Sequence, residues 1–160
     1  RTIILDGFSK PYAMTGWRLG YVIANPELSE IFERYNVNII SSVTTFAQFG
    51  AIEALRMDQS PVEEMVAEFH KRRDYLIPAL NEINGLQCAT PGGAFYAFPN
   101  ITATGMSSQD FADRLLDEAG VATLDGGSFG AGGEGYIRIS YASSMANLEE
   151  AVRRIAKFLK

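Results

Sequence analysis

Lys10 and Arg18 are the residues of this 160-residue chain whose types and spacing point most directly to chemistry. They lie in residues 7–20, which read GFSKPYAMTGWRLG, between two apolar runs, 2–5 and 21–24, that predict strands. Such a segment can place an amine and a guanidinium at one end of a sheet. An amine can form a Schiff base with an aldehyde, and a guanidinium can bind a phosphate through paired hydrogen bonds. For each residue alone, a surface lysine and a structural salt bridge are the simpler alternatives.

The neighbours of Lys10 are compatible with a reactive amine. A lysine must lose its proton before it attacks an aldehyde, and a nearby cation favours that loss because it disfavours the ammonium form. Arg18 is such a cation, and no acidic residue is adjacent to Lys10. Asp6, four residues earlier, is more simply explained as a cap for the turn after the first strand. Two glycines, each two residues from Arg18, would let the backbone approach a ligand closely.

Arg138 is the third candidate. It lies in the strand-like run 136–140, where Ile137 and Ile139 would face one side and Arg138 the other. An arginine on a short apolar strand is costly unless its charge is paired. A carboxylate ligand would pair it, and so would an internal Asp or Glu, and the strand pattern leaves both open.

Composition excludes several other classes of function. The net charge is −5, from 14 basic and 19 acidic residues without a basic stripe, so nucleic-acid binding is not expected. No apolar run reaches the roughly 18–20 residues of a membrane helix. Cys88 and His70 are the only residues of their types, so the sequence predicts no internal disulfide, no metal site and no Ser-His-Asp triad. The glycine-rich run 125–135 lacks the phosphate-loop pattern and predicts a flexible surface loop or a loop at the rim of a site.

The first 60 residues predict two strands and two helices. Asn25-Pro26 begins one helix, with a capping side chain before proline at the first helical position. Residues 44–55 are apolar on nearly all sides and predict a buried helix. Such a helix needs a layer of partners that these 60 residues barely provide. Because the chain also starts at Arg1, directly before a strand, we expect it to be a fragment of a longer protein.

The remaining residues predict a long helix followed by an α/β unit. A capping box from Ser60 to Glu63 opens the long helix, Pro78 is expected to kink it, and Gly85 is expected to end it. Strands and helices then alternate, which favours a compact α/β unit. The predicted strands are 86–89, 94–98, 121–124 and 136–140, and the predicted helices are 107–120 and a final helix that includes 148–159.

The run around Lys10 resembles, without a mismatch, the lysine signature of class I/II aminotransferases, which are fold-type I enzymes that use pyridoxal phosphate. The resemblance looks closest to the aspartate, aromatic and alanine aminotransferases of bacteria and archaea. It implies an α/β fold in which residues 1–60 are the C-terminal part of the large cofactor-binding domain and 61–160 are the interdomain helix and the small domain. It extends in the family's order through residues 15–24, 46–55, 91–99 and 135–142.

The resemblance also implies a role for each candidate residue. Lys10 would be the catalytic lysine that forms a Schiff base with pyridoxal 5'-phosphate, Arg18 would bind the cofactor phosphate, and Arg138 would bind the α-carboxylate of the substrate. Two positions depart from many relatives. Gly7 stands where many have a serine that contacts the phosphate, and Asp125 stands where many have a proline.

The activity implied is transfer of an amino group between an amino acid and a 2-oxo acid by a cytoplasmic homodimer without a metal. We expect this activity of the full-length protein and not of the fragment alone, because the family's residues that hold the cofactor ring would lie upstream. Two alternatives remain open: another fold-type I enzyme such as a carbon–sulfur lyase or a synthase, and a transcription regulator with an aminotransferase-like sensor domain. An upstream helix-turn-helix would favour the regulator. The sequence does not name the amino acid.

Overall fold

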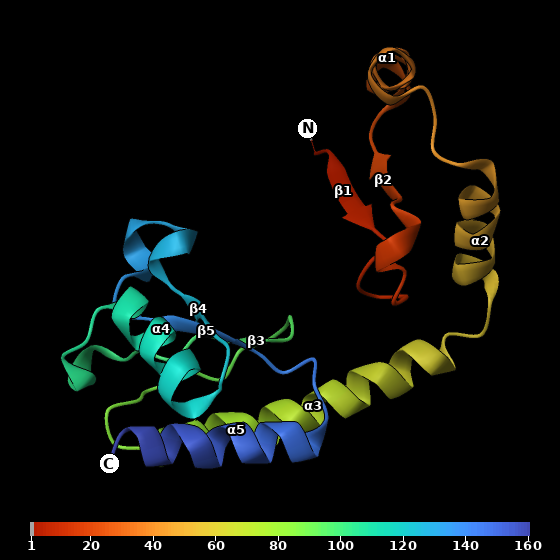
Figure 1. Cartoon of the computed structure of the whole chain (residues 1–160). Helices are drawn as coiled ribbons and strands as arrows, with labels where there is room; N and C mark the ends of the chain where they lie inside the picture. The colour runs from red at the N-terminus through yellow and green to blue at the C-terminus, as the bar shows by residue number, and fades with distance from the viewer. Residues whose placement is uncertain (1) are drawn as a thin grey trace. The chain divides into compact units, whose positions relative to one another are not determined.

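The computed structural model describes residues 2–160, which form two compact units (Figure 1). The first unit ends at Glu64, and the second is Met65–Lys160. Helix α3 (Ser60–Asn81) contains the boundary between them. Mixed helices and strands confirm the predicted α/β class. No helix among the described residues is long and apolar enough to cross a membrane.

An antiparallel hairpin opens the first unit. It consists of β1 (Ile4–Gly7) and β2 (Gly20–Ile23), whose terminal glycines lie opposite each other (Figure 1). Both predicted strands are present, but each is shifted toward the segment that joins them. Glycine permits this close pairing, because a Cβ atom on Gly20 would lie only 2.8 Å from the carbonyl oxygen of Asp6.

Helix α1 (Pro26–Ile40) follows the hairpin and begins where the sequence predicts. The side chain of Asn25 accepts a hydrogen bond from the backbone N–H of Leu28 at 2.9 Å. This bond satisfies one of the N–H groups that the first helical turn leaves without a partner. The predicted N-terminal cap is therefore confirmed.

Helix α2 (Thr45–Arg56) is present as predicted, but the prediction that it is buried is wrong for this chain. Its buried residues are the small ones, Ala47, Ala51 and Ala54, whereas the side chains of Phe46 and Phe49 are 71% and 65% exposed. A helix is buried on all sides only where other elements cover every side. The elements of the first unit cover only the alanine side.

The start of α3 differs from the predicted capping box. The hydroxyl of Ser60 donates a hydrogen bond to the carboxylate of Asp58, and the backbone N–H of Glu63 bonds the carbonyl of Gln59 at 3.1 Å. The bond from the Ser60 hydroxyl lowers the pKa of Asp58, because it stabilises the ionised carboxylate. Ser60 is therefore the first residue of the helix and not the capping residue before it, and its backbone N–H donates to Asp58 Oδ1 at 3.4 Å.

The end of α3 is close to the prediction. The helix continues past Pro78 to Asn81, so this proline lies inside its last turn. Proline has no N–H to donate, and one bond of the helical ladder is absent there. Gly85 lies in the following turn with φ +96°, a conformation that glycine adopts at little cost.

The second unit contains a three-stranded antiparallel sheet in the order β3-β5-β4. Its strands are β3 (Tyr96–Ala97), β4 (Leu124–Asp125) and β5 (Ile137–Ser140). The strand β5 matches its prediction, whereas β3 and β4 are shorter than predicted.

The predicted strand 86–89 is wrong, since a single bridge from Gln87 to Asn100 is all that forms there. The cause is a side chain of α3. Asn81 accepts a hydrogen bond from the backbone N–H of Cys88 at 2.7 Å and donates one to its carbonyl at 2.9 Å. Both backbone groups of Cys88 are thereby bonded to a helix and are not available to a neighbouring strand.

Helix α4 (Ser108–Ala119) packs on β4 and β5, and helix α5 (Met145–Phe158) packs on α4 (Figure 1). Ser107 and Ser144 cap their N-termini, each by accepting a hydrogen bond from the backbone N–H three residues later. Gly120 ends α4 in the left-handed conformation, as predicted.

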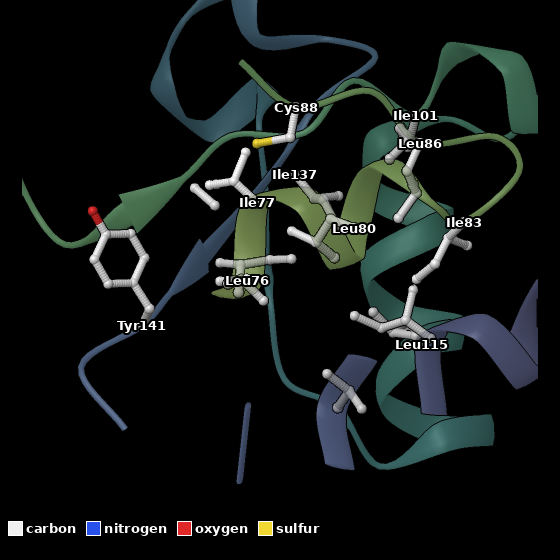
Figure 2. Packing of buried hydrophobic residues seen from close by; sticks show 14 of the residues in the cluster. Leu76, Ile77, Leu80, Ile83, Leu86, Cys88, Ile101, Leu115, Ile137 and Tyr141 are labelled. Atoms are coloured by element: carbon white, nitrogen blue, oxygen red, sulfur yellow. The ribbon is translucent and has the colours of Figure 1, made fainter. Parts of the chain in front are cut away.

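The core of the second unit gathers apolar residues from its helices and from β5 (Figure 2). Along β5, Ile137 and Ile139 are buried, whereas Arg138 between them is on the other face, as the alternation predicts. This core fixes the strand that presents Arg138. Its fully buried members include Leu76, Ile77, Leu80, Ile101, Phe111, Leu115, Ile137, Tyr141 and Ile155.

Candidate active site

Lys10 lies in a hydrogen-bonded turn that follows β1. The backbone N–H of Tyr12 bonds the carbonyl of Phe8 at 3.2 Å, and the N–H of Ala13 bonds the carbonyl of Lys10 at 3.3 Å. Ala13 has φ +53°, so the turn includes a left-handed residue that is not glycine. The side chain of Lys10 is exposed on this turn.

Two buried side chains anchor the turn on either side of Lys10. Phe8 and Met14 are 3% and 8% exposed and form a small cluster with Ala51 and Ala54 of α2. Small residues on α2 allow the turn to approach the helix closely. The position of Lys10 is therefore fixed by apolar packing on both sides of it along the chain.

A second set of contacts ties the turn to its surroundings. The hydroxyl of Tyr12 donates to Gln59 Oε1 at 3.2 Å, and Gln59 Nε2 donates to the carbonyl of Ala54 at 3.1 Å. The turn is thus linked by hydrogen bonds to the end of α2, in addition to its apolar contacts.

Asp6 has the structural role that its position predicts. Its Oδ1 accepts a hydrogen bond from the backbone N–H of Gly7 at 2.7 Å, and its Oδ2 accepts one from the hydroxyl of Tyr21 at 3.3 Å. Loss of hydration, and next the negative charge of Asp6, raise the pKa of Tyr21. These bonds hold the two strands together just before the lysine turn.

Arg18 follows the short 3-10 helix Thr15–Trp17 and has a left-handed backbone with φ +53°. Its Nη1 donates to the carbonyl of Thr15 at 3.1 Å, which bends the side chain back over its own turn. Among residues 2–160 it forms no salt bridge, so the structural ion pair considered from the sequence is not observed. The exposed guanidinium lines a depression of about 580 Å³, together with Gly16 and Phe46.

Trp17 connects the Arg18 turn to α2 through Gly50. A Cβ atom on Gly50 would lie 2.5 Å from the Cζ3 atom of Trp17, so the ring occupies the space that a side chain would need. We expect Gly50→Ala to displace the ring outward at a cost of at most about 1–3 kcal/mol for overpacking, because the ring is 44% exposed, and about 1 kcal/mol of helix propensity offsets part of it. Trp17 is the only tryptophan of the chain, so its fluorescence emission and a denaturant titration measure the effect directly.

Gly16→Ala is the matched control, because a Cβ atom at Gly16 would meet nothing within 4 Å. This variant should retain the emission maximum of Trp17. An unchanged emission spectrum in Gly50→Ala, with unfolding at the same or higher denaturant concentration, would contradict the packing described here.

Arg138 has aromatic partners and not the acidic partner considered from the sequence. Its Cζ atom lies 4.3 Å from the ring centroid of Tyr96 and 4.4 Å from that of Phe129. No salt bridge to Arg138 forms within the described part of the chain. Sequence reasoning missed both rings, because the pattern of a single strand does not say which strand it pairs with, and the pairing of β3 with β5 is what brings Tyr96 near Arg138.

The remaining candidate side chains do not form a competing site. His70 is exposed on α3, whereas Cys88 is buried, and burial raises the pKa of its thiol. Residues 2–160 contain no group of three or more His, Cys, Asp or Glu side chains that could hold a metal ion. Lys10 and Arg18 both lie in the first unit, and Arg138 lies in the second.

The sequence profile of Aminotransferase class I and II matches residues 1–155, and the chain belongs to this family. It is 45% identical over 161 residues to an aspartate aminotransferase of Pyrococcus horikoshii and 46% identical over 162 residues to aromatic-amino-acid aminotransferase 2 of Thermococcus litoralis. These alignments cover 99% and 100% of the chain.

Solved structures agree with these relatives. The crystal structure of an aromatic aminotransferase from P. horikoshii has a TM-score of 0.93 at 44% identity and matches 98% of the chain. That of an aspartate aminotransferase from Rhizobium meliloti has a TM-score of 0.93 at 36% identity and matches 99%. The chain spans 41% of the length of the two relatives above and 42% of each of these structures. The assignment of residues 1–60 and 61–160 to a large and a small domain stays a prediction.

Proposed function

We propose that the full-length protein transfers an amino group between an amino acid and a 2-oxo acid and uses pyridoxal phosphate as its cofactor. The observation that carries this proposal is the lysine turn. Lys10 is exposed between two buried anchors, and Arg18 is exposed on the same segment between β1 and β2. Membership of the aminotransferase family supports the same function.

The residues present fit two parts of pyridoxal phosphate. An aldehyde requires an amine, which Lys10 has, and a phosphate requires a cation with several N–H donors, which Arg18 has. The backbone at Gly7 would also accept a side chain, since a Cβ atom there would make only ordinary contacts at 3.6 Å and beyond. Glycine at this position therefore leaves room near the turn.

In this proposal each candidate has a separate task. Pyridoxal phosphate, when bound, supplies an aldehyde that reacts with amines and a ring that accepts electrons from the substrate Cα atom. Lys10 would hold the cofactor through its Nζ atom, and the same Nζ, as a free amine, would act as the base and acid that moves the proton of the substrate Cα. Arg18 binds the phosphate and Arg138 binds the α-carboxylate, so both ends of the reacting assembly are fixed.

The proposed substrates are an amino acid and a 2-oxo acid, and the proposed assembly is a homodimer in the cytoplasm. Relatives named for aspartate and for aromatic amino acids support the substrate class. We do not choose between these amino acids.

The test is amino transfer by the full-length protein that contains this sequence. The protein is supplied with pyridoxal phosphate, a 15N-labelled amino acid (aspartate, alanine or phenylalanine) and an unlabelled 2-oxo acid. Mass spectrometry then follows the label. Label in the amino acid formed from the 2-oxo acid supports the proposal. In a parallel assay with a 15N-labelled sulfur-containing amino acid, release of labelled ammonia, a thiol and pyruvate without label transfer would favour a carbon–sulfur lyase. Sequence-specific DNA binding without turnover would favour a regulator.

A further inference from the structure

On the outer face of the small sheet, apolar and aromatic side chains lie around Arg138. In the register of the sheet, Arg138 lies opposite Leu124, and Tyr96 lies opposite Ser140, two residues further along β5. Because residues two apart on a strand share a face, Tyr96 and Arg138 are on the same side. The other side carries Ile137, which is fully buried in the core.

Both rings next to Arg138 lie within cation–π distance. Separations of 4.3 and 4.4 Å from the guanidinium carbon to the two ring centroids are well inside the roughly 6 Å range of this interaction. A ring face attracts the cation but accepts none of the strong hydrogen bonds that a carboxylate would accept. An internal Asp or Glu would occupy the N–H groups of Arg138, whereas Tyr96 and Phe129 leave them for an external anion.

The loop that carries Phe129 is braced by side-chain hydrogen bonds. Asp125 Oδ1 accepts a bond from the backbone N–H of Ser128 at 2.9 Å, and Asp125 Oδ2 accepts one from the Ser128 hydroxyl at 2.7 Å. The N–H of Phe129 itself bonds the carbonyl of Gly126 at 2.9 Å. These bonds stabilise the short 3-10 helix Gly127–Phe129 and hold the backbone from which the side chain of Phe129 extends.

The same loop is held against the sheet by its glycines. A Cβ atom on Gly126 would lie 2.1 Å from the carbonyl oxygen of Gly133. The backbone at Gly126 therefore approaches the backbone at Gly133 at a distance that only glycine allows. Gly126 also donates its N–H to the carbonyl of Tyr136 at 2.8 Å, next to β5. Hydrogen bonds and close glycine packing therefore hold a loop that the sequence predicts to be flexible.

The ring of Tyr96 is held in place by packing against other aromatic rings. Its ring lies 4.5 Å from that of Phe95, which stacks on Phe69 of α3 at 5.8 Å between centroids. Both rings that flank Arg138 are thus fixed, one by packing to α3 and the other by the hydrogen-bonded loop.

We propose that Tyr96 and Phe129 are positioning residues that orient the Arg138 guanidinium for the substrate α-carboxylate, and that Asp125 acts with them by holding Phe129. This inference rests on the proposed function, in which Arg138 binds that carboxylate. The rings fix the plane of the guanidinium, so that its N–H edge faces the ligand before the ligand arrives. A guanidinium fixed in this way loses less conformational freedom when it binds.

The test is Phe129→Leu in the full-length protein, compared with Phe129→Trp. Removal of the ring should raise KM for the amino acid and for the 2-oxo acid about 2- to 13-fold, the range that corresponds to ordering one flexible side chain when the ligand binds. The value of kcat should stay within about twofold, because carboxylate binding is lost equally from the ground state and the transition state. Phe129→Trp retains a ring face and should restore KM to near its original value.

Leu116→Ala is the matched control, because it removes an exposed apolar side chain of the second unit that lies on α4 and not on the sheet face that carries Arg138. It should leave KM unchanged. If Phe129→Leu fails to fold, Tyr96→Leu and Tyr96→Phe are compared in the same assay. The leucine variant should raise KM and the phenylalanine variant should not.

The outcomes separate this inference from the proposed function. An unchanged KM in a folded Phe129→Leu or Tyr96→Leu protein that still transfers amino groups would overturn the positioning role and leave the proposed function intact. A wild-type protein without amino transfer would overturn both. A fall in kcat with KM unchanged would also contradict the inference, because it would place the rings in the chemical step.

Discussion

Lys10→Ala is expected to lower kcat for amino transfer in the full-length protein by about 10²–10⁴-fold or more. This range covers the loss of a general base alone, and loss of the amine that holds the cofactor adds to it. The exposed position of Lys10 between the buried anchors Phe8 and Met14 is the reason to expect a local effect. Alanine removes the amine without disturbing either anchor. Steady-state kinetics measure the loss of activity, and the thermal midpoint of unfolding shows separately whether the fold is retained.

Lys71→Ala is the control for this experiment. Lys71 is an exposed lysine on α3 whose contact is an ion pair with Glu68, and its replacement should leave activity unchanged. Lys10→Arg retains the positive charge without a nucleophilic amine and should be as inactive as Lys10→Ala. Amino transfer at the original rate by a folded Lys10→Ala protein would remove Lys10 from the site and the proposed mechanism with it.

Local signals in the sequence were sufficient to predict where most helices begin. Asn25 and Ser107 each accept a hydrogen bond from the backbone N–H three residues later, at the two places where the sequence predicts that these helices begin. A helix cap involves only residues within one turn, so a short sequence motif is enough to predict it. The alternation along β5 is equally local, and it correctly places Arg138 away from the core.

Two of the errors arise from contacts with another element of the structure. The strand predicted at 86–89 is lost because the side chain of Asn81 bonds both backbone groups of Cys88. The apolar residues of α2 predict that this helix is buried. Burial depends, however, on which elements cover the helix, and only its alanine side is covered. No periodicity within a segment contains this information.

The candidate site shows the same division. Lys10, Arg18 and Arg138 are found from residue type, spacing and resemblance. The residues that position them are not found in this way, because the contacts form only in the folded chain. These contacts join Phe8 to Ala51, Trp17 to Gly50, and Phe129 to Arg138. Residue type and spacing are therefore enough to nominate candidate reactive groups here, whereas the packing around them becomes visible only in the structure.

Arg138→Leu is expected to lower kcat/KM for amino acids in the full-length protein by about 30-fold to several thousand-fold. The range corresponds to the roughly 2–5 kcal/mol lost when one partner of a hydrogen-bonded charge pair is removed. Leucine suits the site, because Tyr96 and Phe129 already form an apolar surface around this position. Arg138→Lys retains the charge but not the planar fork of N–H donors, so its loss should be smaller than that of leucine but still measurable.

Cofactor affinity distinguishes the two arginines. Arg138→Leu should bind pyridoxal phosphate as the unmodified protein does, whereas Arg18→Leu should bind it more weakly, because each arginine is proposed to hold a different anion. Absorbance titration with pyridoxal phosphate measures this difference without turnover. If Arg138→Leu weakened cofactor binding and left KM for the amino acid unchanged, Arg138 would contact the cofactor and not the substrate. The aromatic pair around it would then orient a cofactor ligand.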